Sequence, residues 1–234
     1  MRNMLKKEFL LMFRTSKWII LAWGVFQVLI PVVLVRETAN LIRDQATLNR
    51  LFVQMLVFYP MMTIPVVCVL VFTGGVNEER RQGILMVLLA NGVKQKQIWR
   101  GKLLASLIVS ESISLLAEGV TLFLLRMING FWLSFSLKEA ILLLFLVPFV
   151  SMAISGVLCL VLWGFQHGQL FATMIPYLLF FGCCCTSVFK VNLIEKVSLL
   201  LGLGIFSAGV IVVIISERLV ALFSNEHIVN LGRS

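Results

Sequence analysis

Two carboxylates stand inside an otherwise apolar stretch of this chain, where a charge is costly. Glu111 and Glu118 lie seven residues apart, with Ser114 between them, in the run from Leu103 to Leu125. Seven residues make nearly two helical turns, so on a helix these three side chains share one face. Acidic residues in such a setting usually face a bundle interior or a water-filled cavity. The pattern predicts a polar stripe along a substrate path or at a dimer interface; the alternative is structural, with carboxyls that are paired or protonated and bonded to neighbouring helices.

The other residue types that could do chemistry do not combine into a site. Adjacent cysteines on a helix point about 100° apart, and no CxxC pattern or nearby histidine accompanies them. Glu78-Glu79 resembles the paired glutamates of one membrane metalloprotease family, but Gly83 stands where that family has arginine, and His167 and His227 lie outside the apolar stretches. We therefore expect no enzyme, no catalytic residue, and no metal ion or cofactor bound by this chain. The cysteines are Cys68, Cys159, Cys183, Cys184 and Cys185.

The composition is that of a membrane protein. Of 234 residues, 60% are hydrophobic and 13% are charged, whereas soluble domains are about half apolar and about a quarter charged. The net charge of +9 comes from basic residues beside apolar runs, which favours anionic lipid and membrane topology over nucleic acid as the reason for the charge. The basic N-terminus lacks a small-residue cleavage site after its apolar run, so we expect a retained helix.

Six stretches are apolar enough to cross a bilayer, which takes about 20 helical residues. Because the backbone in lipid must satisfy its own hydrogen bonds, we predict that all six are helices. The fold class is then an all-α polytopic membrane protein, forming a single transmembrane domain over residues 1–234. The predicted spans are residues 18–35, 51–76, 103–125, 140–165, 170–189 and 197–216.

The basic residues that flank these spans predict the orientation. Lys and Arg are nearly twice as frequent on the side that holds the N-terminus, the segment 77–102 and the C-terminal tail. That side is expected to be cytosolic, with both termini inside the cell membrane. In residues 4–16 the apolar side chains recur at helical spacing, away from the basic ones, which is typical of an amphipathic helix in the lipid interface. The apolar residues are Leu5, Phe9, Met12 and Phe13, and the basic residues are Lys6, Lys7 and Arg14. The alternative is a simple basic flank that orients the first span.

The loop 77–102 carries most of the information about function. Ile84, Leu85, Leu88 and Leu89 share one helical face, and Asn91-Gly92 is typical of a turn. A short amphipathic helix is therefore expected here, either with its apolar face in the groove of a partner protein or resting on lipid.

The order of residues in this loop resembles the coupling loop of ABC exporter permeases of the second type. Gly92 stands where a proline is common in that family, and Met86 where many members have Glu. The predicted topology is also similar to that of these permeases. The residues that carry the resemblance are Glu79, Arg81, Gly83, Leu85, Leu88, Leu89, Val93, Ile98, Gly101 and Lys102.

The resemblance implies a permease subunit that works with a separate ABC-type ATPase subunit. The chain has no GxxxxGK[ST] phosphate loop, so ATP and Mg²⁺ are expected on the partner. A second permease copy or paralogue is implied as well, and the cargo is expected to be lipophilic or amphipathic, such as a peptide antibiotic, a drug or a lipid-like molecule. The residues implied in coupling to the ATPase are Glu79, Arg81, Gly83, Leu85, Leu88, Leu89 and Val93.

Two other functions remain open on the sequence. A secondary transporter usually shows inverted repeats and polar or broken helices at mid-membrane, and here only the third span is polar. A non-transporting immunity or sensor protein that sequesters a peptide at the membrane would differ from an exporter in needing no ATPase partner.

Overall fold

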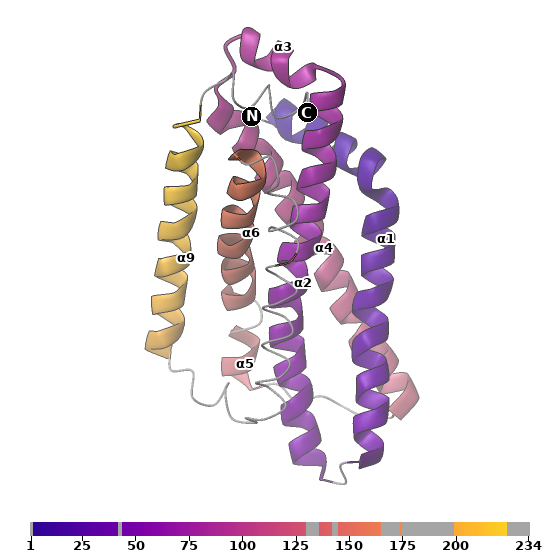
Figure 1. Ribbon diagram of the computed structural model, residues 1–234. Helices are drawn as coiled ribbons and strands as arrows, with labels where there is room; N and C mark the ends of the chain where they lie inside the picture. The colour runs from indigo at the N-terminus through magenta and orange to yellow at the C-terminus, as the bar shows by residue number, and fades with distance from the viewer. Residues whose placement is uncertain are drawn as a thin grey trace.

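The computed structural model describes residues 2–41, 44–129, 136–141, 145–164, 174 and 199–223, and this part of the chain is helical, with no strand. The predicted all-α fold class is confirmed for these residues. The helices that the structure describes are α1 (Arg2–Leu41), α2 (Gln45–Arg81), α3 (Ile84–Ala90), α4 (Gln95–Asn129), α5 (Leu137–Ile141), α6 (Val147–Gly164) and α9 (Leu199–Val220) (Figure 1).

Within the described residues, four helices are long and apolar enough to cross a membrane. They run over Lys6–Leu34, Tyr59–Arg81, Gln95–Met127 and Val147–Gly164. Helices of this length and composition indicate a membrane protein, because lipid both accepts their apolar side chains and leaves their backbones to pair internally.

The predicted spans map onto the helices as follows. Spans 18–35, 51–76 and 103–125 fall within α1, α2 and α4, span 140–165 falls on α5 and α6, and span 197–216 falls on α9. The predicted span 170–189 lies outside the described residues except for residue 174.

The N-terminal region differs from the expected separate interfacial helix. Residues 4–16 and 18–35 belong to one uninterrupted helix, α1, since no Gly or Pro precedes Gly24 to break it. The first turns of α1 lean across the end of the bundle beneath α3, and the remainder runs along the bundle (Figure 1). Met12 is fully buried, whereas Phe13 is exposed, so the early turns of α1 contact the protein as well as its surroundings.

The core lies toward the α3 end of the bundle, where α2, α4, α6 and α9 meet. α1 packs against α2 and α4, α2 also packs against α6, and α6 packs against α9. The rings of Phe72 on α2 and Trp163 on α6 meet edge to face, with centroids 6.3 Å apart. Trp99 near the start of α4 and Leu85 of α3 are buried in the same cluster. Large buried aromatic groups of this kind hold the ends of the four long elements in fixed positions.

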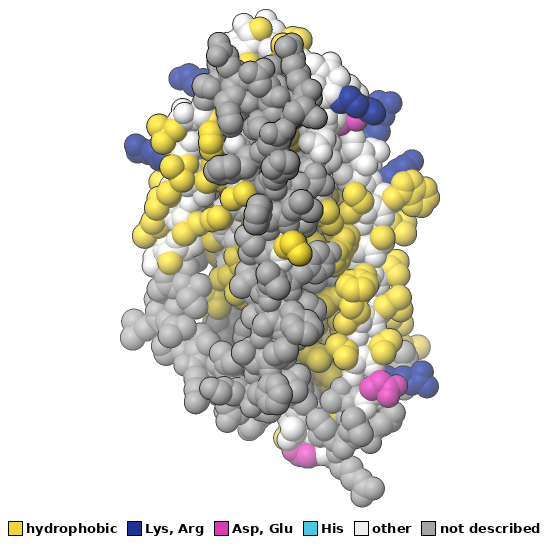
Figure 2. All heavy atoms as spheres, viewed as in Figure 1, with side chains coloured by type: hydrophobic (Ala, Val, Ile, Leu, Met, Phe, Trp, Pro, Cys, Tyr) yellow, Lys and Arg dark blue, Asp and Glu magenta, His cyan; other side chains and the backbone are white. Residues whose placement is uncertain are grey.

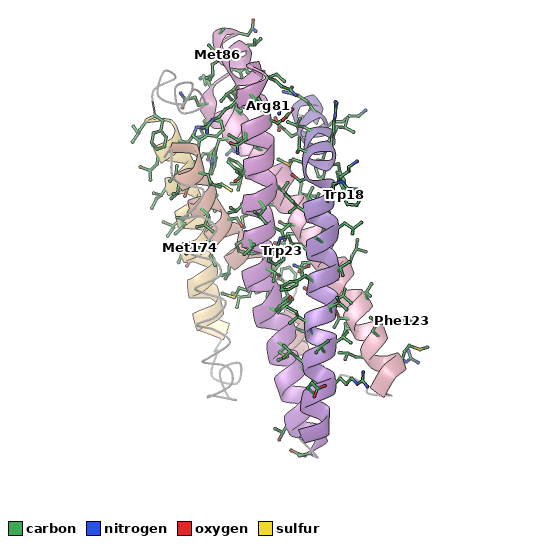
Figure 3. All side chains as sticks on the ribbon, turned by 45° about the vertical axis from the view of Figure 1, so that its right-hand side comes forward. Trp18, Trp23, Arg81, Met86, Phe123 and Met174 are labelled. Carbon is green, nitrogen blue, oxygen red and sulfur yellow. The ribbon has the colours of Figure 1, made fainter. Side chains whose placement is uncertain are left out.

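The flanks of the bundle are apolar, and its described charges collect toward one end. Figure 2 shows hydrophobic side chains along both flanks, and most of the visible Lys and Arg toward the α3 end. Trp18 on α1 and Phe123 on α4 are 72% and 61% exposed and point away from the bundle (Figure 3). Exposed apolar surface on this scale is unusual for a soluble monomer, and it suits sides that face lipid.

Candidate functional site

Helix α3 is held between two glycine turns that join it to α2 and α4. Gly83 and Gly92 have φ angles of 69° and 77°, in the left-handed region that other residues rarely adopt. After α3, the amide of Gly92 donates to Leu89 O at 3.1 Å and that of Val93 donates to Leu88 O at 3.1 Å. This pair of hydrogen bonds is a Schellman cap, which explains why a glycine follows Asn91. The turn thus fixes the direction of α3 relative to α4.

Replacing Gly92 by Ala should lower the stability of this turn. The new methyl group meets no atom within 4 Å, but a left-handed conformation costs a residue with a Cβ about 1–2 kcal/mol. We expect a matching loss of unfolding free energy in detergent. Gly119→Ala is the control, because Gly119 lies inside α4 with equally open space around it, where Ala is favoured. Equal stability of the two variants would contradict the role of the turn.

The two faces of α3 meet different surroundings. Leu85 is 2% exposed, and Leu88, Leu89 and Val93 pack against the same core cluster. The apolar face of α3 was expected to meet a partner protein or lipid, but it packs on the protein's own helix bundle. Met86, noted in the sequence only as a departure from the family pattern, is 43% exposed, and Val87 is 59% exposed. Met86 lies at the tip of the molecule (Figure 3).

Among the other residues of this loop that were predicted to couple to an ATPase, one is exposed and one is buried. Arg81 is exposed and pairs with Glu78 at 3.0 Å. Gly83 forms the turn, and Glu79 is fully buried. Of the residues proposed for coupling, only Arg81 is exposed, so the others would act through the position of α3 rather than by touching a partner.

A buried charge cluster joins α1, α2 and α4 close to the α3 turn. The Lys102 ammonium donates to Glu8 Oε2 at 2.8 Å and lies 2.8 Å from Glu79 Oε2. Lys7 donates to Glu79 Oε1, also at 2.8 Å. The side chains of Glu8, Glu79 and Lys102 have no exposed surface, whereas Lys7 is partly exposed. The two acids and two lysines balance in charge, which is the condition for keeping such groups out of water.

The charge cluster was not predicted as a unit. The sequence analysis named Lys102 only as part of the loop pattern and Glu79 there and in the Glu78-Glu79 pair, and it did not name Glu8. The one feature of the sequence that points to the charge cluster is Glu8, the single acid in the basic segment of residues 2–17.

The predicted polar stripe of α4 faces the bundle interior, but its residues meet different helices. Glu111 contacts α6, whereas Ser114 and Glu118 face α1 and α2. The Ser151 hydroxyl of α6 donates to Glu111 Oε1 at 2.9 Å. The Ser114 hydroxyl donates to Glu118 Oε1 at 3.1 Å within α4. Glu118 and Ser114 line a small cavity closed by α1 and α2, away from Glu111. Glu111 is thus hydrogen-bonded to a neighbouring helix, as the structural alternative expects, whereas Glu118 lines the cavity.

The class that fold and site define is a helical membrane protein with a short helix between two glycine turns at one end and a small, mostly apolar cavity lined by Glu118 inside. Within the described residues, no three His, Cys, Asp or Glu side chains lie close enough to hold a metal ion together. Comparison with protein families, with curated proteins and with solved structures found no match.

Proposed function

We propose that this chain is the membrane-spanning subunit of an ATP-driven exporter, and that its partner ATPase docks on α3. The observation that carries the proposal is the α2–α3–α4 unit. A short helix is locked by glycine turns onto the joined ends of two long helices, with an exposed apolar tip formed by Met86 and Val87. An apolar helix tip of this kind fits a hydrophobic groove in another protein.

The charges favour placing α3 in the cytosol, where an ATPase would be. Lys and Arg gather toward the α3 end (Figure 2), and basic residues concentrate on the cytosolic side of membrane proteins. Lys17 lies over the ring of Trp18, 5.7 Å from its centroid, a combination typical of the membrane interface. In this orientation the six predicted spans leave both termini inside the cell.

Force applied to α3 would reach three helices at once. The turns at Gly83 and Gly92 connect α3 covalently to α2 and α4. The Lys102 contacts add α1 to the same rigid end. In the proposed cycle, ATP binding draws two ATPase subunits together, each α3 moves with its ATPase, and the helix ends shift as one body. Two permeases then open a path outward for a lipophilic or amphipathic cargo.

Co-purification tests this proposal. The tagged chain is extracted from its native membrane in mild detergent, and the proteins that travel with it are identified by mass spectrometry. We expect a stoichiometric subunit that carries the GxxxxGK[ST] phosphate loop, which this chain lacks. An intact chain that purifies without any such subunit would shift the choice to a secondary transporter or to a stand-alone immunity or sensor protein.

A further inference from the structure

A small cavity lies between α1, α2 and α4, on the far side of the charge cluster from α3. Its volume is about 20 Å³, and its walls are mostly apolar, with Phe52 and Pro60 of α2 among them. Room of this size holds about one water-sized particle. Side chains with polar groups line it from α1, α2 and α4: Gln27, Tyr59, Ser114, Glu118 and Thr121. The cavity is therefore a mostly apolar space with a few polar side chains in its wall.

Gln27 is the residue that this cavity leaves unsatisfied. It is 3% exposed, and neither its amide oxygen nor its amide nitrogen has a hydrogen-bond partner among the described residues. A buried amide without partners is costly, and native proteins seldom leave one so. Gln27 is also the one polar side chain, tryptophans aside, in the predicted span 18–35. Its place in the cavity wall points to a bound polar ligand as its partner.

The hydroxyl groups of the cavity are already committed as donors. Thr121 Oγ1 donates to Ala117 O at 2.8 Å, and Ser114 Oγ donates to Glu118 Oε1 at 3.1 Å. The Tyr59 hydroxyl donates to Phe26 O at 3.4 Å. The oxygens of these hydroxyl groups can therefore act only as acceptors toward a ligand in the cavity. Together with the Glu118 carboxylate and the amide oxygen of Gln27, they form a set of acceptors that suits a hard cation.

The charge of the site selects the class of cation. In its ionised form Glu118 brings one negative charge, and no Lys, Arg or His is among the residues that line the cavity. A single positive charge balances it, whereas a divalent ion would leave a net charge in surroundings of low dielectric constant. We propose that the cavity binds one small monovalent cation, held by the Glu118 carboxylate and by the amide oxygen of Gln27. The cation is either a free ion such as Na⁺ or the ammonium end of an amphipathic amine.

The inference does not require the proposed ATPase, because it concerns this chain alone. It is tested on the purified full chain in neutral detergent, with dicyclohexylcarbodiimide as the reagent and labelling of Glu118 read by peptide mass spectrometry. The reagent attacks a protonated carboxyl in apolar surroundings, whereas a bound cation keeps the carboxyl ionised and occupies its oxygens. Samples are prepared in choline chloride, whose cation is too large for the cavity, and are then titrated with NaCl, with dodecylamine or with dodecanol.

We expect NaCl or dodecylamine to protect Glu118, and dodecanol to have no effect. Protection by NaCl identifies a free ion, whereas protection by dodecylamine alone identifies an amphipathic amine. In Gln27→Met, which keeps the size of the side chain but removes its amide oxygen, half-protection should need about tenfold more cation, since contacts to charged groups are among the stronger ones. Glu111 is the internal control, because it is bonded to Ser151 outside the cavity.

Three outcomes would overturn the proposal: no protection by either cation, equal protection by dodecanol, or an unchanged titration in Gln27→Met. A second measurement covers a carboxyl that the reagent does not reach. Either NaCl or dodecylamine should raise the Tm of the wild type above its value in choline chloride, because a ligand bound to the native state stabilises it. That rise should vanish in Glu118→Gln. A rise that persists in this variant, or no rise in the wild type, contradicts binding at this site.

Discussion

Replacing Lys102 by Met should cost the folded protein about 3–5 kcal/mol, the usual effect of removing one partner from a buried ion pair. Lys102 lies 2.8 Å from both Glu8 Oε2 and Glu79 Oε2, and none of these three side chains is exposed. Without the ammonium, two carboxylates remain in the interior, with only Lys7 beside them. We expect this loss as a lower midpoint of unfolding in detergent, followed through tryptophan fluorescence.

Two further variants show whether the effect comes from the charge cluster. Lys94→Met removes an exposed lysine from the same loop and should change stability by less than about 0.5 kcal/mol. The double variant Glu8→Gln with Lys102→Met leaves the Lys7–Glu79 pair balanced, so it should be more stable than Lys102→Met alone. If the losses of unfolding free energy caused by the two substitutions simply add, the two residues are not coupled, and the described role of the cluster is wrong.

Replacing Val87 by Glu should prevent capture of the ATPase without unfolding the protein. Val87 is 59% exposed on the outer face of α3, so the substitution is expected to change stability by less than about 0.5 kcal/mol. A carboxylate at the centre of an apolar contact must lose its water without gaining a partner. We expect at least a tenfold weaker association, or about 1.4 kcal/mol. The measurement is the amount of ATPase recovered per permease in the co-purification described above.

Leu137→Glu is the matched control for Val87→Glu. Leu137 begins α5 and is 79% exposed, and α5 lies at the end of the bundle away from α3 (Figure 1). The control adds the same charge at an even more exposed apolar position, so it should leave ATPase recovery unchanged. Full recovery with Val87→Glu, or equal loss with both variants, would speak against docking on α3.

The helices could be predicted from the sequence because their causes are local. Apolar length sets the spans, and the Asn91-Gly92 turn closes α3 through a cap that depends on a glycine at one position. The continuity of α1 was not predicted, since a basic segment beside an apolar one suggests two elements. Nothing in the backbone separates them, however, and helix formation is cooperative, so the helix continues.

The site was less predictable because its contacts join residues far apart in the chain. Lys7 and Glu79 are 72 positions apart, and Glu8 and Lys102 are 94 apart. Helical periodicity placed Ile84, Leu85, Leu88 and Leu89 on one face, but it does not say whether that face meets a partner, lipid or the protein itself. Gln27 was not singled out from the sequence, where only the third span was described as polar, and its role is suggested by the cavity beside Glu118.

The most direct test of the central claim is site-specific photo-crosslinking in native membranes. A photoreactive phenylalanine derivative replaces Val87 in one sample and Leu137 in another, and each crosslinked product is identified by mass spectrometry. We expect Val87 to crosslink to an ATPase subunit bearing a phosphate loop, and Leu137 to give no such product. If Val87 gives no ATPase product, or if Leu137 gives the same one, α3 is not the docking site and the exporter proposal loses its main support.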